Sequence, residues 1–482
     1  MNAHDTHTAR ERGSELGALL RLAWPVVAAE IGWVTMWLVD SMMVGPLGAE
    51  ALGAVALGGS LCFVFAIAGL GMLLGLDFLV AHAFGAGDLR RAHAALVQGG
   101  YLALVLGVVL TAILLAAVPA LPLLGADPTV VTLAEPYMRA SAWSLAPLLL
   151  FTALRRYLQA MGIVQPIMVT LLAANVVNAV ADWALVYGHL GAPVLGVAGA
   201  GWATCFSRTF MLLGLLGYTL WRERRRASGL AAVPLRPDPV LARQLVRLGV
   251  PAATQLLLEV GSFTIVTALA ARLAPAALAA HHVAISVASF TFMVPLGLSS
   301  AAAVAVGQAL GRGHGAAARR AGWTALALGA GFMLAAAVAF VLGAEAIVRL
   351  FTSVPEVVAT GVTLLYVAAV FQLSDGIQVV TTGALRGTGD TRTPLLANLV
   401  GHWLLSLPLG AVLCFRFGAG VVGLWIGLAA GLSAVATVLL WVWRRHARRL
   451  GGDARGPRLR ESAPGGSVPA GRGAAPTDLR VA

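Results

Sequence analysis

Residues 51–80 read ALGAVALGGSLCFVFAIAGLGMLLGLDFLV, an apolar run in which Asp77 is the only charged residue. An α-helix crosses the hydrocarbon core of a bilayer with about 20 apolar residues. The run is long enough for one complete crossing and therefore predicts a membrane-spanning helix. Asp77 lies near one end of it, where we expect the carboxylate to pair with an arginine of a neighbouring loop.

The composition of the whole chain indicates the same class of protein. Of its 482 residues, 59% are hydrophobic and 11% are charged, whereas soluble domains carry about 25% charged residues. All 33 basic residues are arginines, and the net charge of +12 lies mainly between the apolar runs and in the tail. No basic face with interleaved aromatic residues occurs, so we expect no nucleic-acid binding.

Apolar runs of similar length recur along the chain and predict twelve membrane spans. The predicted spans are 22–44, 51–80, 94–118, 134–154, 166–188, 196–221, 249–271, 278–308, 321–344, 358–384, 394–415 and 419–443. The polar N-terminus is followed by no small-residue cleavage pattern, so we expect the first run to be a retained span. Connections rich in arginine alternate with connections that hold only Arg272, Arg349 and Arg416. The positive-inside rule therefore places both termini in the cytoplasm.

The two halves of the chain repeat each other, with Pro25 matching Pro251 and setting an offset of 226 residues. The same offset relates Arg21 to Arg247, Leu22 to Leu248, Leu47 to Leu273, Leu52 to Leu278, Leu70-Gly71 to Leu296-Gly297, Gly85 to Gly311 and Gly87 to Gly313. Six spans per half is an even number, so the repeats run parallel about an axis along the membrane normal. We predict an all-α integral membrane fold of twelve transmembrane helices in two pseudo-symmetric six-helix bundles.

The predicted domain organisation follows from the spans and the repeat. The N-terminal bundle covers residues 1–221, a cytoplasmic linker covers 222–248, and the C-terminal bundle covers 249–445. Residues 446–482 are rich in Gly, Pro and Arg, which predicts a disordered cytoplasmic tail.

Four motifs resemble those of the multidrug and toxic compound extrusion (MATE) family. They are WPVVAAEIGWVTMWLVDSMMVGPLG (24–48), GLDFLVAHAFGAG (75–87), AALAAHHVA (276–284) and DGIQVVTTGALRGTGDTRTP (375–394). His82 and His282 stand where the family usually has Gln. The resemblance covers residues 18–445 and implies secondary active efflux of organic cations or related lipophilic compounds. It also implies exchange against protons or sodium.

The N-terminal half carries one candidate cation-coupling site. At 1.5 Å of rise per residue, Asp40 of span 22–44, Asp182 of span 166–188 and Thr204 of span 196–221 fall at a similar depth. Asn178 precedes Asp182 by one helical turn and shares its face. Two carboxylates, an amide and a hydroxyl suit a hard cation or a proton. The resemblance implies the same role for an Asp of the first span and an Asn-x-x-x-Asp of the fifth, and helix packing is the alternative reading for Asn178.

The C-terminal half carries a second candidate cation-coupling pair. Glu259 and Asp375 both fall near the middle of their spans, and both positions match acidic residues of the sodium-coupled branch of the family. That branch has a Tyr four residues before the Asp, where this chain has Phe371. The missing hydroxyl leaves the choice between protons and sodium open.

Further residues are candidates for the substrate cavity and for moving parts. The cavity candidates are Glu30, Trp33, Trp37, His281, His282 and Phe371, with helix packing as the alternative for the aromatic and histidine side chains. Pro25 and Pro251 occupy equivalent positions in the leading helix of each half, and each removes a helical hydrogen bond. We expect these two prolines to act as hinges or as static kinks.

Two other functions compete with antiport. A flippase for lipid-linked saccharides can use a similar fold, but it should place cationic side chains in its cavity. A membrane-embedded enzyme needs a clustered nucleophile and base, an H-E-x-x-H metal site or a Walker loop, and the sequence has none of these. We therefore expect a non-enzymatic carrier of the bacterial inner membrane, monomeric and surrounded by lipid. Protons or sodium are its only expected cofactor.

Overall fold

The computed structural model describes residues 3–125 and 127–452, and the regular structure in these residues is entirely helical. The helices are α1 (Ala3–Val44), α2 (Ala49–Leu73), α3 (Gly75–Gly85), α4 (Leu89–Ala117), α5 (Pro128–Ala142), α6 (Leu145–Ala160), α7 (Gln165–Tyr187), α8 (Val197–Arg226), α9 (Pro239–Ala270), α10 (Pro275–Gly311), α11 (Gly315–Arg349), α12 (Pro355–Gly387), α13 (Arg392–Asn398), α14 (Leu407–Ala411) and α15 (Gly420–Gly452). Three of the predicted spans are interrupted, and they form the pairs α2–α3, α5–α6 and α13–α14. Short π-helical segments, Leu399–Ser406 and Val412–Arg416, flank α14.

Twelve helical rods result, as the sequence predicts. Ten helical segments in the described part of the chain are long and apolar enough to cross a membrane. The other two rods are α5–α6 and α8, and both carry arginines inside the helix, including Arg155 and Arg208. The all-α, twelve-helix membrane fold is therefore confirmed.

The helices extend beyond the predicted spans at their polar ends. The span predicted to begin at residue 249 belongs to α9, which begins at Pro239 because Asp238 accepts hydrogen bonds from Val240 N (2.9 Å) and Leu241 N (3.1 Å). Asp88 caps α4 in the same way, 2.9 Å from Arg91 N. Hydropathy detects only the apolar part of a helix, whereas capping carboxylates set where it starts. At the other end of the chain α15 continues to Gly452, inside the predicted tail, and residues 453–482 lie outside the described residues.

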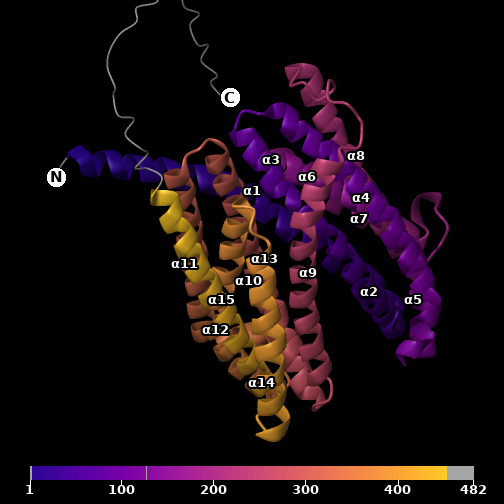
Figure 1. Cartoon of the computed structure of the whole chain (residues 1–482). Helices are drawn as coiled ribbons and strands as arrows, with labels where there is room; N and C mark the ends of the chain where they lie inside the picture. Colours follow the sequence, from indigo (N-terminus) through magenta and orange to yellow (C-terminus); the bar gives the residue numbers. More distant parts are fainter. Residues whose placement is uncertain (1–2, 126, 453–482) are drawn as a thin grey trace, which may run out of the picture.

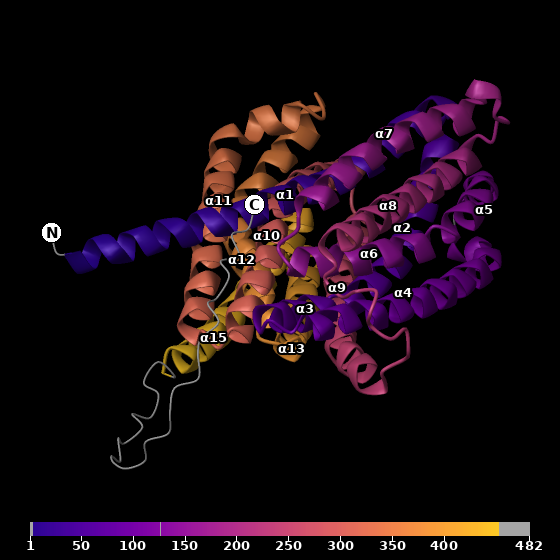
Figure 2. The same cartoon turned by 90° about the horizontal axis from the view of Figure 1, so that it is seen from above.

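The connections define two ends of the molecule. We call "arginine-rich end" the end with the loops 86–88, 161–164, 227–238, 312–314 and 388–391, where α15 also ends. The opposite, "arginine-poor end" holds the loops 45–48, 118–127, 188–196, 271–274, 350–354 and 417–419. Figure 1 shows the α2–α8 helices and the α10–α15 helices diverging from the first end toward the second, and Figure 2 shows the two groups side by side with α9 between them.

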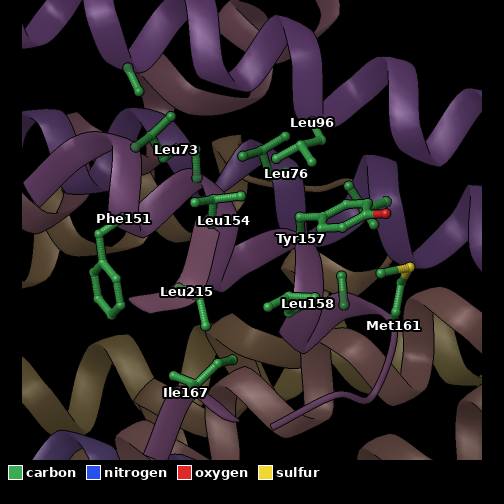
Figure 3. Packing of buried hydrophobic residues seen from close by; sticks show 14 of the residues in the cluster. Leu73, Leu76, Leu96, Phe151, Leu154, Tyr157, Leu158, Met161, Ile167 and Leu215 are labelled. Carbon is green, nitrogen blue, oxygen red and sulfur yellow. The ribbon is translucent and has the colours of Figure 1, made fainter. Parts of the chain in front are cut away.

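The buried apolar clusters follow this division. At the arginine-poor end each cluster belongs to one half: one runs from Val44 to Ala200 and the other from Val266 to Leu432. At the arginine-rich end the clusters cross between the halves. The cluster around Tyr157 and Leu158 of α6, shown in Figure 3, also includes Leu245 of α9. The hydrophobic core thus joins the two halves at one end only.

Close backbone contacts at the arginine-rich end follow the sequence repeat. A Cβ added to Gly71 would lie 2.4 Å from Cα of Ala253, and one added to Gly297 would lie 2.4 Å from Cγ2 of Val27. These contacts are repeat mates, because the offset of 226 relates Gly71 to Gly297 and Val27 to Ala253.

A second pair of contacts obeys the same symmetry. A Cβ on Gly85 would lie 2.2 Å from the carbonyl oxygen of Gln308, and one on Gly311 would lie 2.1 Å from that of His82. The repeat, first seen as matching letters, is therefore the contact surface between the halves. Glycine is required there because real Cβ atoms do not approach other heavy atoms this closely.

This packing predicts opposite effects for the same substitution at two helical glycines. Gly71→Ala should lower the free energy of unfolding by roughly 1–3 kcal/mol, because its Cβ meets the backbone of α9. Gly217→Ala in α8 meets nothing within 4 Å and should be neutral or stabilising by up to ~1 kcal/mol through helix propensity. Thermal midpoints of the purified variants in detergent would measure both. Equal midpoints would contradict the proposed contact.

Candidate functional site

Three helices bring the predicted N-terminal site together. Asp40 lies on α1, Asn178 and Asp182 lie one turn apart on α7, and Thr204 lies on α8. Each of the four side chains is no more than 6% exposed. Three polar helix faces therefore meet inside the N-terminal half, toward the arginine-poor end.

The geometry of this site leaves acceptors free. Thr204 Oγ1 donates a 3.3 Å hydrogen bond to Asp40 Oδ2, and the Asp40 carboxylate also faces Asp182 and Asn178. Among the described residues, no hydrogen-bond partner exists for Asp40 Oδ1, for either oxygen of Asp182, or for either amide atom of Asn178. Buried polar atoms are nearly always paired in proteins. So many free oxygens in one place fit a site for an oxygen-loving cation or a proton.

Arg208 is the residue of this site that sequence reasoning did not place. We expected an acid to pair with it, but in the structure its Nη1 donates a 2.6 Å hydrogen bond to Ser144 Oγ. Its guanidinium carbon also lies 5.8 Å from the ring centre of Trp33. Arg208 lies one turn from Thr204 on α8 and interacts electrostatically with Asp40. The spacing of Thr204 and Arg208 is the signal that could have linked them.

The C-terminal pair lies between α9 and α12. Gln378 Nε2 donates a 3.0 Å hydrogen bond to Glu259 Oε1, and Gln255 also faces that carboxylate. Asp375 is 7% exposed and interacts electrostatically with Glu259. The two glutamines were not predicted, although each lies one turn from an acid of the pair. Glu259 is thus held by amides, in contrast to the free oxygens of Asp182.

Glu30, predicted to face the substrate cavity, forms an ion pair with Arg155 of α6. Both side chains are largely buried, with 12% and 9% of their surface exposed. The carboxylate therefore has a partner in this state and could meet a substrate only by exchanging it. The sequence gave no partner for Glu30, because Arg155 lies in a distant span.

A second buried ion pair joins the two halves. Asp77 of α3 is fully buried and lies 3.1 Å from Nε of Arg386 in α12 and 3.4 Å from Nη1 of Arg156 in α6. We expected Asp77 to pair with a loop arginine, and the structure gives it two helical ones. Arg155 and Arg386 are repeat mates in the motif Ala-Leu-Arg. In each half this arginine therefore neutralises a buried acid.

The other cavity candidates lie in different environments. His281 is fully buried: its Nδ1 accepts a 3.0 Å hydrogen bond from Trp425 Nε1, and its Nε2 lies 2.9 Å from Thr267 Oγ1. Phe371 is 2% exposed and packs 5.5 Å from the ring of the same Trp425. Neither side chain has a free polar atom or open face for a substrate in this state.

Trp37 and His282 are exposed, whereas Trp33 is half-buried beneath Arg208. The hinge candidates Pro25 and Pro251 are buried inside the long helices α1 and α9. Both helices continue through these prolines in this state.

No group of three or more His, Cys, Asp and Glu side chains suited to a metal ion occurs within residues 3–125 and 127–452. A cation at the N-terminal site would therefore be held by a mixed set of two carboxylates, an amide and a hydroxyl. Such a set uses oxygen ligands alone, which suits sodium or a proton better than a transition metal.

Comparison with known proteins gives the family. The MatE family model matches residues 25–184 and again 251–412. The two matches begin at Pro25 and Pro251, the positions that define the repeat.

Related proteins match over most of their length. The chain is 40% identical over 437 residues to the "Probable multidrug resistance protein NorM" of Bradyrhizobium diazoefficiens, covering 90% of this chain and 94% of that protein. The protein of the same name from Brucella suis biovar 1 is 37% identical over 447 residues, with 91% and 94% covered.

Among solved structures, the eukaryotic MATE transporter AtDTX14 has the same fold. It superimposes with a TM-score of 0.81 at 23% identity, covering 91% of this chain and 98% of that one. The fold, the doubled family match and these relatives agree with one another, and the chain is an integral membrane protein that belongs to the MatE family of transporters.

Proposed function

We propose that this protein exports lipophilic cations from a bacterial cell by antiport against protons or sodium. The observation that supports this most directly is the buried set of Asp40, Asp182, Asn178 and Thr204, in which five polar atoms have no partner among the described residues. Its relatives named multidrug resistance proteins support efflux of this kind. Their names identify neither the coupling ion nor the substrates of this chain.

The proposed orientation places the arginine-rich end in the cytoplasm of the cell, with the protein in the inner membrane. Positively charged loops are retained on the cytoplasmic side during insertion. The N-terminal site then lies in the outer half of the membrane, where a proton or sodium ion can arrive from outside. A monomer suffices, because both candidate sites are made within one chain.

The exchange itself requires only that two cations compete for the same carboxylates. Two buried carboxylates are costly at membrane depth unless a proton, a metal ion or a substrate cation neutralises them. When a coupling ion binds Asp40 and Asp182, a cationic substrate loses its counter-charge and leaves. The binding of either cation shifts the balance between conformations by its different affinity for each.

Glu259 and Asp375 are the second candidate for the coupling step. The amides of Gln378 and Gln255 hold Glu259, so this pair has less free coordination than the N-terminal set. We therefore propose the N-terminal set as the main coupling site.

Alternating access requires the two halves to separate at the arginine-rich end. That end is closed in this structure by glycine contacts and by the pair between Asp77 and Arg386. Opening toward the cytoplasm must therefore break an ion pair that is buried here. Glu30 lies near the same end and can change partners when the surrounding helices move.

The transport proposal is tested by efflux of a fluorescent lipophilic cation from proteoliposomes, with a proton gradient or a sodium gradient imposed separately. Wild type should respond to one gradient, and Asp40→Asn should reduce that response by at least tenfold. Glu259→Gln should reduce it less, because its site offers fewer free ligands. Glu135→Gln removes an exposed acid that pairs with Arg139 and should transport like wild type. Lack of movement under both gradients would refute antiport of this cation.

The closure of the arginine-rich end predicts an order of stabilities. Asp77→Asn leaves Arg156 and Arg386 without their shared carboxylate, and removal of one partner from a buried pair costs about 3–5 kcal/mol. Arg386→Gln leaves the contact between Asp77 and Arg156 in place and should cost less. Thermal midpoints in detergent should fall further for Asp77→Asn. The reverse order would show that Arg386 has another essential partner.

A further inference from the structure

A cavity of about 600 Å³ lies at the arginine-rich end, between the two halves. The N-terminal half contributes α3 and α4, and the C-terminal half contributes α9, α13, α15 and the loop 388–391. None of the proposed coupling residues lines it. The cavity is therefore separate from the transport site.

Three arginines from three different helices line this cavity: Arg91 of α4, Arg247 of α9 and Arg392 of α13. Throughout the described residues, none of their guanidinium groups makes an ion pair or a hydrogen bond. His82 and His446 add two ring systems, and His446 Nδ1 is bonded to the carbonyl of Val442, which leaves Nε2 available. The polar surface of the cavity is therefore dominated by positive donors.

The one carboxylate on the cavity wall is already occupied. Asp390 accepts hydrogen bonds from Thr393 N at 3.0 Å and from Thr393 Oγ1 at 2.7 Å, which close the turn before α13. Three unpaired guanidinium groups therefore face a single carboxylate that serves the backbone. A cavity of this charge lacks an anion.

Apolar side chains form the rest of the wall, among them Phe78, Leu79 and Leu248. We propose that the cavity binds a phosphate-bearing anion, either the head group of an anionic phospholipid or a soluble phosphate compound. Guanidinium groups bind phosphate oxygens through paired hydrogen bonds, and basic pockets between membrane helices bind anionic head groups. The apolar wall suits the glycerol and upper acyl carbons of a lipid.

The position of the cavity gives the ligand a regulatory effect. The anion would contact Arg91 in one half and Arg247 and Arg392 in the other, and so bridge them. A ligand stabilises the conformation that binds it best. The bound anion would thus favour the state in which the arginine-rich end is closed. This inference does not depend on the identity of the transported compound.

The test is equilibrium binding to the purified full-length protein in detergent, with three probes. Dioctanoyl phosphatidylglycerol should bind, dioctanoyl phosphatidylcholine at equal concentration should not, and potassium phosphate, matched in ionic strength by potassium chloride, tests the soluble source. Arg91→Gln, Arg247→Gln and Arg392→Gln should each weaken binding about fivefold, the equivalent of ~1 kcal/mol per arginine.

Two neighbouring arginines serve as matched controls. Arg90 precedes Arg91 on α4, and Arg243 lies one turn before Arg247 on α9, but neither lines the cavity. Arg90→Gln and Arg243→Gln should therefore leave affinity within about twofold of wild type. Thermal midpoints of all five variants without ligand show whether each is folded.

The outcomes separate the sources and can overturn the proposal. Binding of phosphatidylglycerol that potassium phosphate does not displace supports a lipid head group, whereas binding of phosphate alone supports a soluble anion. If neither binds, or if Arg90→Gln and Arg243→Gln weaken binding as much as the cavity variants, the site is refuted.

Discussion

The contact between the two halves at the arginine-rich end is the constraint on which the rest of the structure depends. Gly85 and Gly311 each place a backbone against the carbonyl oxygen of the opposite half, at distances that admit no side chain. Because such contacts cannot be compressed or gradually stretched, the halves are either together or apart at this end. A carrier needs two such discrete arrangements, and the glycine pairs provide one of them.

The treatment of buried charge separates structural acids from functional ones. At the arginine-rich end Glu30 and Asp77 are each neutralised by arginine. Toward the other end Asp40 and Asp182 share one hydroxyl hydrogen bond and otherwise keep free oxygens. Both arrangements are costly in a membrane, but only the second leaves the cost to be offset by a mobile cation. Burial alone therefore does not identify a coupling residue, whereas burial without a protein partner does.

Sequence reasoning predicted what depends on periodicity and depth. It gave the twelve helices, the repeat, and the common level of Asp40, Asp182 and Thr204, because span length and rise per residue fix these quantities. It did not find Arg208, or the arginine partners of Glu30 and Asp77, because such contacts join distant spans whose rotation about their axes is not encoded in hydropathy. It also placed His281 and Phe371 in the cavity, whereas packing against Trp425 buries both. Span starts were misplaced wherever an aspartate caps a polar first turn, as at Asp238.

The halves share a backbone but not a chemistry. By the offset of 226, Asp40 corresponds to Val266, which lies in the apolar cluster of the C-terminal half, and Glu259 corresponds to Trp33. On the leading helix of each half the two acids are thus seven positions apart in register, or about 10 Å along the helix axis. Symmetric contacts allow the halves to rock as equivalent bodies, whereas polar groups at different depths make the two sites unequal. Two unequal sites on one symmetric hinge can bind different cations at different stages of the same motion.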